Sequence, residues 1–310
     1  MPVHLFICRR VSTMNPYVLS CSSTVDLDAG HLEKRNISYV RFHFYVDGVH
    51  HYDDMGQSMS SHDFFDSMRK GAMTKTSQIN VSEFAEYFEK FLQEGKDVVH
   101  VSLSSGLSGS CQSAKIAAQE LAEKYPECKV YVVDSLAASS GYGLLIDTLA
   151  DLRDEGMSAE MLYHWAEENK LRVHHWFFST DLQYYLRGGR VSRGSYVIGT
   201  ILGICPLLHM DAAGKLIPVA KIRTKKRVIE ELVHRMEENA DNGTDYAGRC
   251  YICHSDCLED ARAAEALVED RFPNLKGKIR IFNIGTVIGS HSGPGTVALF
   301  FFGKPRDAEA

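Results

Sequence analysis

A loop rich in serine and glycine stands between an apolar stretch and a helix-like stretch in "HVSLSSGLSGSCQSAKIAAQELAEK", residues 100–124. The apolar residues of 98–103 suit a buried strand, and residues 112–124 are dense in helix-favouring types. The loop between them offers four hydroxyls, those of Ser104, Ser105, Ser108 and Ser110. Hydroxyls and backbone N–H groups at a helix start form a neutral, donor-rich cradle, which suits an anion.

The same loop fails the patterns of three known chemistries. A Walker phosphate loop ends in Gly-Lys-Ser/Thr, whereas Gly109 is followed by Ser110 and Cys111. The dinucleotide fingerprint needs three spaced glycines, and the loop has Gly106 and Gly109. A hydrolase nucleophile elbow reads G-x-S-x-G, and Ser110 stands where its second glycine belongs. An ordinary strand-to-helix turn capped by serine stays open as the alternative.

Four further stretches place polar residues at predicted turns. "KTSQINVSEF" (75–84) puts uncharged donors just before a helix, as the serine loop does. "LRGGRVSRG" (186–194) clusters arginines about two glycines, which indicates either a solvated turn or a site for phosphate or an acidic partner. "KIRTKKR" (221–227) adds cations at a helix start, where they oppose the helix dipole. "GSHSGPGTVALFFFGK" (289–304) puts His291 in a loop, where a ligand contact competes with a structural role.

The cysteine-rich stretch "CYICHSDC" (250–257) invites a metal interpretation. In a strand, however, alternation sends Cys250 and Cys253 to opposite faces. A single C-x-x-C also lacks the second pair that a structural zinc site needs. Reduced, buried thiols are therefore the preferred interpretation, and nothing in the cysteine spacing requires an oxidising compartment.

Composition limits the classes of protein to be considered. The chain has 310 residues, of which 45% are hydrophobic and 24% charged, as in globular proteins. A net charge of -6 gives the chain no overall basic character, which argues against binding of duplex nucleic acid. No apolar run approaches the roughly 20 residues of a membrane span, and the arginines near the start are unlike a signal peptide. We expect a cytoplasmic protein in which residues 1–15 form a loose extension.

Residues 16–170 alternate strand and helix patterns, which predicts an N-terminal α/β domain with a doubly wound parallel sheet. The predicted strands are "YVLSC" (17–21), "SYVRFHFYV" (38–46), "VVHVSL" (98–103) and "KVYVVD" (129–134). The predicted helices cover residues 82–94, 112–124, 139–153 and 159–169.

Residues 171–310 follow a different order, which predicts a second α/β domain with a mixed or antiparallel sheet. The strands "CPLLHM" (205–210) and "KLIPVAKI" (215–222) are joined by only four residues and must form a hairpin. The other predicted strands are "VHHWFFS" (173–179), the stretch at 248–253, "KIRIFNI" (278–284) and "GTVALFFFG" (295–303). The predicted helices are "DLQYYLRGG" (181–189), 193–203, 224–239 and 257–271.

Seven of these motifs, in order between Tyr17 and Lys304, resemble the DegV family of fatty-acid-binding proteins. They are "SSTVDL", "TSQ", "SSGLSGS", "VVDS", "LRGGR", the hairpin from "ICPLL" to "AKIRT", and "HSGPGTVALFFFGK". The resemblance implies two α/β domains with one long-chain fatty acid in a tunnel between them. It also implies that the protein is no enzyme itself and carries no cofactor, but presents the fatty acid to a separate kinase subunit that makes acyl phosphate.

The resemblance carries the carboxylate site over to matching positions. Thr76 and Ser108 would donate hydrogen bonds to the fatty acid carboxylate, and His291 would complete the network. Ser77 and Ser105 are also expected to bind the carboxylate. Hydroxyls and amides can hold a carboxylate without the tight ion pair of a lysine, so the acyl group would stay reactive.

Three arginines are expected to face the kinase or its nucleotide phosphates, namely Arg187, Arg190 and Arg223. Basic residues at glycine-rich turns are poor core material but suit anionic partners.

Two positions depart from the family pattern. The family usually has an Asp before the serine of the first loop, and Ser22 stands at that position here. How the group that this Asp would orient is held in this chain is left open. Ile79 follows "TSQ" where the family favours proline, which predicts a less rigid loop.

Two enzyme classes compete with a lipid-binding module. A serine-dependent hydrolase of acyl esters would use Ser108, Asp134 and His291 as a triad, in the chain order of α/β-hydrolases. Against it, the elbow glycine is missing and no oxyanion motif is evident. A self-contained kinase would need a phosphate loop or a metal-binding acidic motif, and the sequence has neither.

Overall fold

The computed structural model describes residues 15–191 and 204–306. Most of the predicted extension (1–15) and the predicted helix at 193–203 lie outside the described residues. Among the described residues, the strands form three sheets. None of the described helices combines the length and the apolar character that crossing a membrane requires.

The first sheet is the predicted parallel sheet. Its strands β1 (Tyr17–Ser22), β2 (Ile37–Val40), β6 (Asp97–Ser102) and β7 (Val130–Asp134) take the order β2-β1-β6-β7, and every neighbouring pair is parallel. The helices of this part are α1 (Ala29–Lys34), α3 (Val81–Leu92), α4 (Ser110–Lys124) and α6 (Ala159–Asn169). As predicted, the serine loop connects the carboxyl end of β6 to α4.

A second sheet, of three antiparallel strands, was not expected. It contains β3 (His43–Val46), β4 (Val49–Tyr52) and β5 (Thr74–Ser77) in the order β4-β3-β5, and α2 (Ser61–Arg69) lies between β4 and β5 in the chain. The prediction of one strand over 38–46 is wrong at its middle. The backbone N–H of Phe42 donates to Ser23 and its carbonyl accepts from Asp53, so the chain leaves the first sheet there.

The third sheet is mixed and contains the predicted hairpin. Its order is β10-β9-β8-β13-β11-β12, and β9 pairs antiparallel with β10. The strands are β8 (Val173–Phe178), β9 (Ile204–Met210), β10 (Leu216–Arg223), β11 (Cys250–His254), β12 (Arg280–Asn283) and β13 (Val297–Phe302). The helices of this part are α7 (Gln183–Arg187), α8 (Lys225–Asn239), α9 (Leu258–Arg271) and α10 (Thr286–Ser292).

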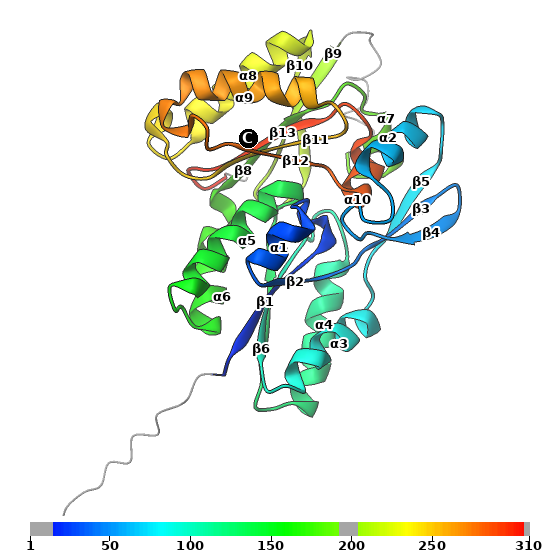
Figure 1. The fold of residues 1–310 in the computed structure, drawn as a ribbon, viewed down its shortest axis with the longest axis vertical. Helices are drawn as coiled ribbons and strands as arrows, with labels where there is room; N and C mark the ends of the chain where they lie inside the picture. The colour runs from blue at the N-terminus through cyan, green and yellow to red at the C-terminus, as the bar shows by residue number, and fades with distance from the viewer. Residues whose placement is uncertain (1–14, 192–203, 307–310) are drawn as a thin grey trace, which may run out of the picture.

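The two faces of the mixed sheet pack against different helices. Residues of α8 and α9 form one apolar cluster with one face, and Figure 1 shows both helices lying across that face. On the other side, α5 (Ser139–Asp154) contacts β8, β11 and β13. We call the apolar cluster with α8 and α9 the outer cluster and the cluster on the α5 side the inner cluster. Cys250 belongs to the outer cluster and Cys253 to the inner cluster, which confirms the predicted alternation. The described residues contain no group of three side chains suited to a metal ion.

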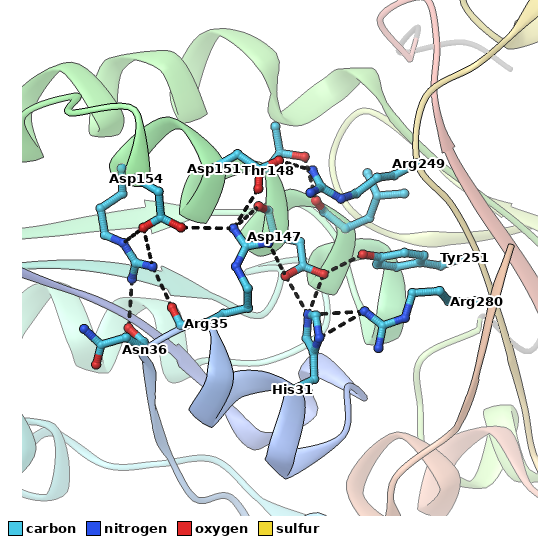
Figure 2. A network of polar contacts seen from close by, with 12 residues as sticks. His31, Arg35, Asn36, Asp147, Thr148, Asp151, Asp154, Arg249, Tyr251 and Arg280 are labelled. Atoms are coloured by element: carbon cyan, nitrogen blue, oxygen red, sulfur yellow. Dashed lines mark hydrogen bonds and ion pairs between the residues drawn. The ribbon is translucent and has the colours of Figure 1, made fainter. Parts of the chain in front are cut away.

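A polar network joins α1 and α5 to the mixed sheet (Figure 2). Asp147 of α5 accepts hydrogen bonds from Nε2 of His31 at 2.7 Å and from the Tyr251 hydroxyl at 2.5 Å. Arg280 of β12 lies 3.0 Å from Nδ1 of His31, so the His31 ring stands between a cation and an anion. Burial would raise the pKa of Asp147, but the hydrogen bonds from His31 and Tyr251 outweigh it and the pKa is lowered.

Candidate functional site

A cavity of about 360 Å³ lies between the first two sheets and the inner face of the mixed sheet. Its wall is largely apolar, with side chains that include Phe42, Leu103, Phe177, Met210, Val287 and Phe300. The volume is in the range of small-molecule sites, and an apolar wall with a few converging polar groups is typical of a ligand pocket.

Four of the predicted carboxylate-site residues line this cavity. Thr76 and Ser77 come from the end of β5, Ser108 from the serine loop and His291 from α10. The Thr76 hydroxyl and Nε2 of His291 are hydrogen bonded at 2.7 Å, although they are 215 positions apart in the chain. The fold therefore brings together the hydroxyls and the imidazole that the sequence placed on separate segments.

Short contacts hold the β5 loop against the serine loop. The backbone N–H of Ile79 donates to the Ser110 hydroxyl at 3.2 Å. A proline at position 79 could not make this bond, so the departure from the family pattern supplies its own restraint. The side chain of Gln78 lies against Gly109, where an added Cβ would be 2.2 Å from Oε1. Glycine at 109 is what allows this approach.

The hydroxyl of Ser108 points into the same network. It lies 3.1 Å from the Ser110 hydroxyl and accepts the backbone N–H of Ser110 at 3.3 Å. The Ser110 hydroxyl already accepts from Ile79, so its own proton is free to go to Ser108. When Ser110 donates in this pair, the Ser108 proton is left for another acceptor.

His291 lies in the last turn of the short helix α10, not in a loop as predicted. The ring is largely buried, and its Nδ1 has no hydrogen-bond partner among the described residues. Burial, with a smaller contribution from the positive charges of Arg190 and Arg187, lowers the pKa of His291 to about 3. His291 is therefore neutral near pH 7.

The predicted site residue Ser105, and Ser22, which departs from the family pattern, lie elsewhere. Ser105 is exposed and is not among the described residues that line the cavity; its backbone N–H donates to Asp134 at 3.1 Å. Ser22, at the position of the family's Asp, is the buried last residue of β1, where its hydroxyl contacts the hydroxyls of Thr24 and Tyr142. Tyr142 also accepts the backbone N–H of Ser22, so position 22 itself is held without a carboxylate.

The three predicted docking arginines have different surroundings. Arg187 is exposed at the end of α7, with its guanidinium 5.1 Å from the centre of the Tyr184 ring. Arg223 is exposed at the end of β10. Arg190 is half-buried in the cavity wall, where Nε donates to the carbonyl of Leu107 at 3.2 Å. Desolvation by burial lowers the pKa of Arg190.

The hydrolase triad is not assembled in the described part of the chain. Asp134 accepts the backbone N–H groups of Ser105 and Leu136, and the hydrogen bond of His291 goes to Thr76. A triad needs the acid on one side of the imidazole and the serine on the other. Neither of these two bonds is present among the described residues.

Sequence reasoning missed the buried end of the cavity. Ser139, at the start of α5, and Cys253, on β11, line this end, and their side chains are 3.3 Å apart. Behind them Asp26 accepts hydrogen bonds from Ser139 and from the backbone N–H of Gly285. Burial raises the pKa of Asp26 well above its usual value. The signal was faint: Asp26 belongs to "SSTVDL", but nothing in the spacing connects it with residue 139 or 285.

Comparison with known proteins agrees with this geometry. The model of the DegV family, described as an uncharacterised protein family, matches residues 21–304. A DegV domain-containing protein of Clostridium perfringens is 35% identical over 294 residues, covering 95% of this chain and all of the relative.

Solved structures show the same fold. A DegV lipid-binding protein of Thermotoga maritima superimposes with a TM-score of 0.81 at 27% identity, covering 94% of this chain and 100% of that one. A fatty-acid-binding DegV family protein of Thermus thermophilus gives a TM-score of 0.80 at 26% identity, covering 93% and 100%. Because the family model spans nearly the whole described fold and its motifs supply the residues around the cavity, this chain belongs to the DegV family.

Proposed function

We propose that the protein binds a long-chain fatty acid in the cavity, with the carboxylate at Thr76, Ser108 and His291. The observation that carries the proposal is the cavity wall, which is largely apolar and has the hydroxyls of Thr76 and Ser108 beside the imidazole of His291 at one end. Relatives described as lipid-binding and fatty-acid-binding proteins support the choice of ligand.

A carboxylate only accepts hydrogen bonds, so each hydroxyl must keep its proton for it. This condition sets the tautomer of His291. If Nε2–H donates to Thr76, the Thr76 proton is free for the ligand; if Thr76 donates to Nε2, it is not. We therefore assign the Nε2–H tautomer, in which His291 acts through Thr76. Ser77, at the same end of β5, also lines the cavity and is proposed to assist.

The second part of the proposal is that the bound acid is presented to a separate fatty acid kinase. In that step a carboxylate oxygen attacks the terminal phosphorus of the kinase's nucleotide, and the bond from that phosphorus to the leaving diphosphate breaks. Arg187 and Arg223 are exposed and suit docking of an anionic surface. Arg190, in the wall beside the head-group residues, suits the phosphoryl group as it reaches the carboxylate.

The binding step is tested by native mass spectrometry of the purified protein, followed by removal of lipid and titration with palmitic acid. A co-purified mass that dissociates as a fatty acid, and restored binding after titration, is the expected result. Assays with acyl esters run in parallel, because turnover lost in Ser108→Ala would favour the hydrolase. A protein that neither retains nor rebinds any fatty acid would overturn the proposal.

A further inference from the structure

We propose that Ala298 and Cys253 set the length of the acyl chain that the cavity accepts, because they form the wall against which the terminal methyl group stops. The inference rests on the proposed function and adds which lengths of fatty acid the cavity selects.

The cavity has an open end and a closed end, which burial distinguishes. At the head-group end, Gln78 and Gly109 are exposed and His291 is partly exposed. At the other end the lining residues are Ala138, Ser139, His175, Cys253, Ala298 and Phe300, none more than 8% exposed. A fatty acid with its carboxylate at Thr76 and Ser108 therefore directs its tail toward Ala298 and Cys253.

Strand alternation determines which side chains meet the tail. In β13, Val297, Leu299 and Phe301 belong to the outer cluster, whereas Ala298 and Phe300 face inward. Ala298 is paired in register with Cys253 of β11 on one side and with Phe177 of β8 on the other. The two small side chains lie next to each other, so they leave space that a larger residue would fill.

The polar atoms at this end already have protein partners, which indicates a methyl terminus. Nε2 of His175 accepts from the backbone N–H of Ala138 at 3.2 Å, and Nδ1 lies 3.1 Å from the carbonyl of Val173. The Ser139 hydroxyl bonds to Asp26 and to the Cys253 thiol. A hydroxyl on the tail would find no free partner among these groups and would be buried unsatisfied.

The closed end is also braced from behind. Ser139 has a left-handed backbone (φ 53°), which a residue with a Cβ adopts at a cost. Its hydrogen bond to Asp26, whose other oxygen accepts from Gly285 at 3.0 Å, holds that conformation. A wall fixed in this way resists displacement by a chain that is too long.

Substitutions of graded size at one position test the inference. Ala298→Val and Ala298→Leu should move the preference of the lipid-free protein from stearic toward myristic and dodecanoic acid. Each methylene that loses its place costs roughly a factor of four in Kd, so Ala298→Leu should raise the ratio of the stearic to the myristic Kd by about tenfold or more. The smaller Val side chain suits a strand and is the variant to measure if the Leu variant does not fold.

Two further variants complete the set. Phe300→Leu removes bulk from the same face and should shift the preference toward arachidic acid. Leu299→Met changes the opposite face of β13, which packs in the outer cluster, and is the matched control. It should leave the order of affinities unchanged. In the unmodified protein, ω-hydroxylation of the preferred acid should weaken binding about fivefold or more.

The possible outcomes separate the two proposals. If the unmodified protein binds no fatty acid of any length, the proposed function fails. If it binds fatty acids but Ala298→Val, Ala298→Leu and Phe300→Leu all keep its order of affinities, the inference about the closed end is overturned while the function stands. Equal affinity for the ω-hydroxylated acid would also overturn it.

Discussion

Nδ1 of His291 lies directly against the α-carbon of Gly188, where an added Cβ would be 2.3 Å away. The first glycine of "LRGGR" therefore makes room for the imidazole that bonds to Thr76. The second, Gly189, has a left-handed backbone (φ 71°) and open space around it. One glycine thus serves the site and the other serves the turn.

This pair makes a matched prediction. Gly188→Ala should displace the His291 ring from Thr76 and weaken fatty acid binding about tenfold or more, the loss expected for one hydrogen bond to a charged group. Gly189→Ala should cost about 1 kcal/mol of folding stability through backbone strain but leave the affinity of the folded protein unchanged. Isothermal titration with palmitic acid, together with urea unfolding, compares the two. Equal affinities in both variants would contradict the role given to Gly188.

The hydroxyls of Thr76 and Ser108 should each contribute to holding the carboxylate. Replacing either with alanine is expected to weaken palmitic acid binding by about 1–3 kcal/mol, the range for leaving a buried charged group short of a hydrogen bond. Ser105→Ala is the control, because Ser105 is in the same loop but exposed and outside the described cavity lining. The assignment fails if Thr76→Ala and Ser108→Ala bind as tightly as Ser105→Ala.

Elements with strong local signals could be predicted from the sequence. The four residues between the predicted strands 205–210 and 215–222 left a hairpin as the only connection, and it is present as β9 and β10. The amphipathic helices α8 and α9 were found within one or two residues of their ends. The serine loop was correctly placed at the carboxyl end of a parallel strand. In each case the deciding interactions lie close together in the chain.

The remaining errors involve contacts distant in sequence. The break between β2 and β3 depends on Ser23 and Asp53 bonding to Phe42, which no periodicity reveals. The "HSGPG" stretch reads as a loop, yet α10 forms because it packs against α2, α7, β3 and β5. Arg190 was expected at the surface because of its charge. In the structure it lies in the cavity wall, where it donates to the carbonyl of Leu107, and no local pattern in the sequence connects these two residues.

Stability should fall in acid partly because of His100. This residue is completely buried beside Phe84 and Phe88, and burial lowers its pKa to about 3. Between pH 6.5 and 3 the unfolded chain binds a proton there and the folded chain does not, so stability decreases as pH falls. At pH 5 the contribution is about 2 kcal/mol.

The variant His100→Phe isolates this contribution, because phenylalanine cannot titrate. Other buried groups titrate in both proteins, so the quantity to compare is the change in unfolding free energy from pH 7 to pH 5. We expect the unmodified protein to lose about 2 kcal/mol more than the variant over this interval. Parallel pH profiles in urea unfolding would show that His100 is protonated in the folded protein.

Asp147 should be the most important member of the network in Figure 2. Its side chain is 1% exposed and accepts hydrogen bonds from two residues. His31 belongs to α1, and Tyr251 belongs to β11 of the mixed sheet. Asp147→Ala would leave the buried Tyr251 hydroxyl without its acceptor and would take the carboxylate away from His31, and should lower the unfolding free energy by about 3 kcal/mol. Asp154→Ala removes a carboxylate that is 55% exposed and should change it by less than about 0.5 kcal/mol. Similar losses in both variants would contradict this ranking.

The arginines should separate lipid binding from transfer to the kinase. Arg187 and Arg223 are exposed, so Arg187→Ala and Arg223→Ala should leave palmitic acid affinity unchanged and lower the single-turnover yield of acyl phosphate with a fatty acid kinase. Arg190 lines the cavity and bonds to Leu107, so Arg190→Ala should lower both. Arg190→Lys keeps the charge but not the planar fork, and should restore affinity more than yield. Bound lipid and acyl phosphate are to be measured in the same preparation. If Arg187→Ala and Arg223→Ala lose lipid as Arg190→Ala does, the exposed arginines are not docking residues. If none of the three variants changes the yield of acyl phosphate, the kinase contact lies elsewhere.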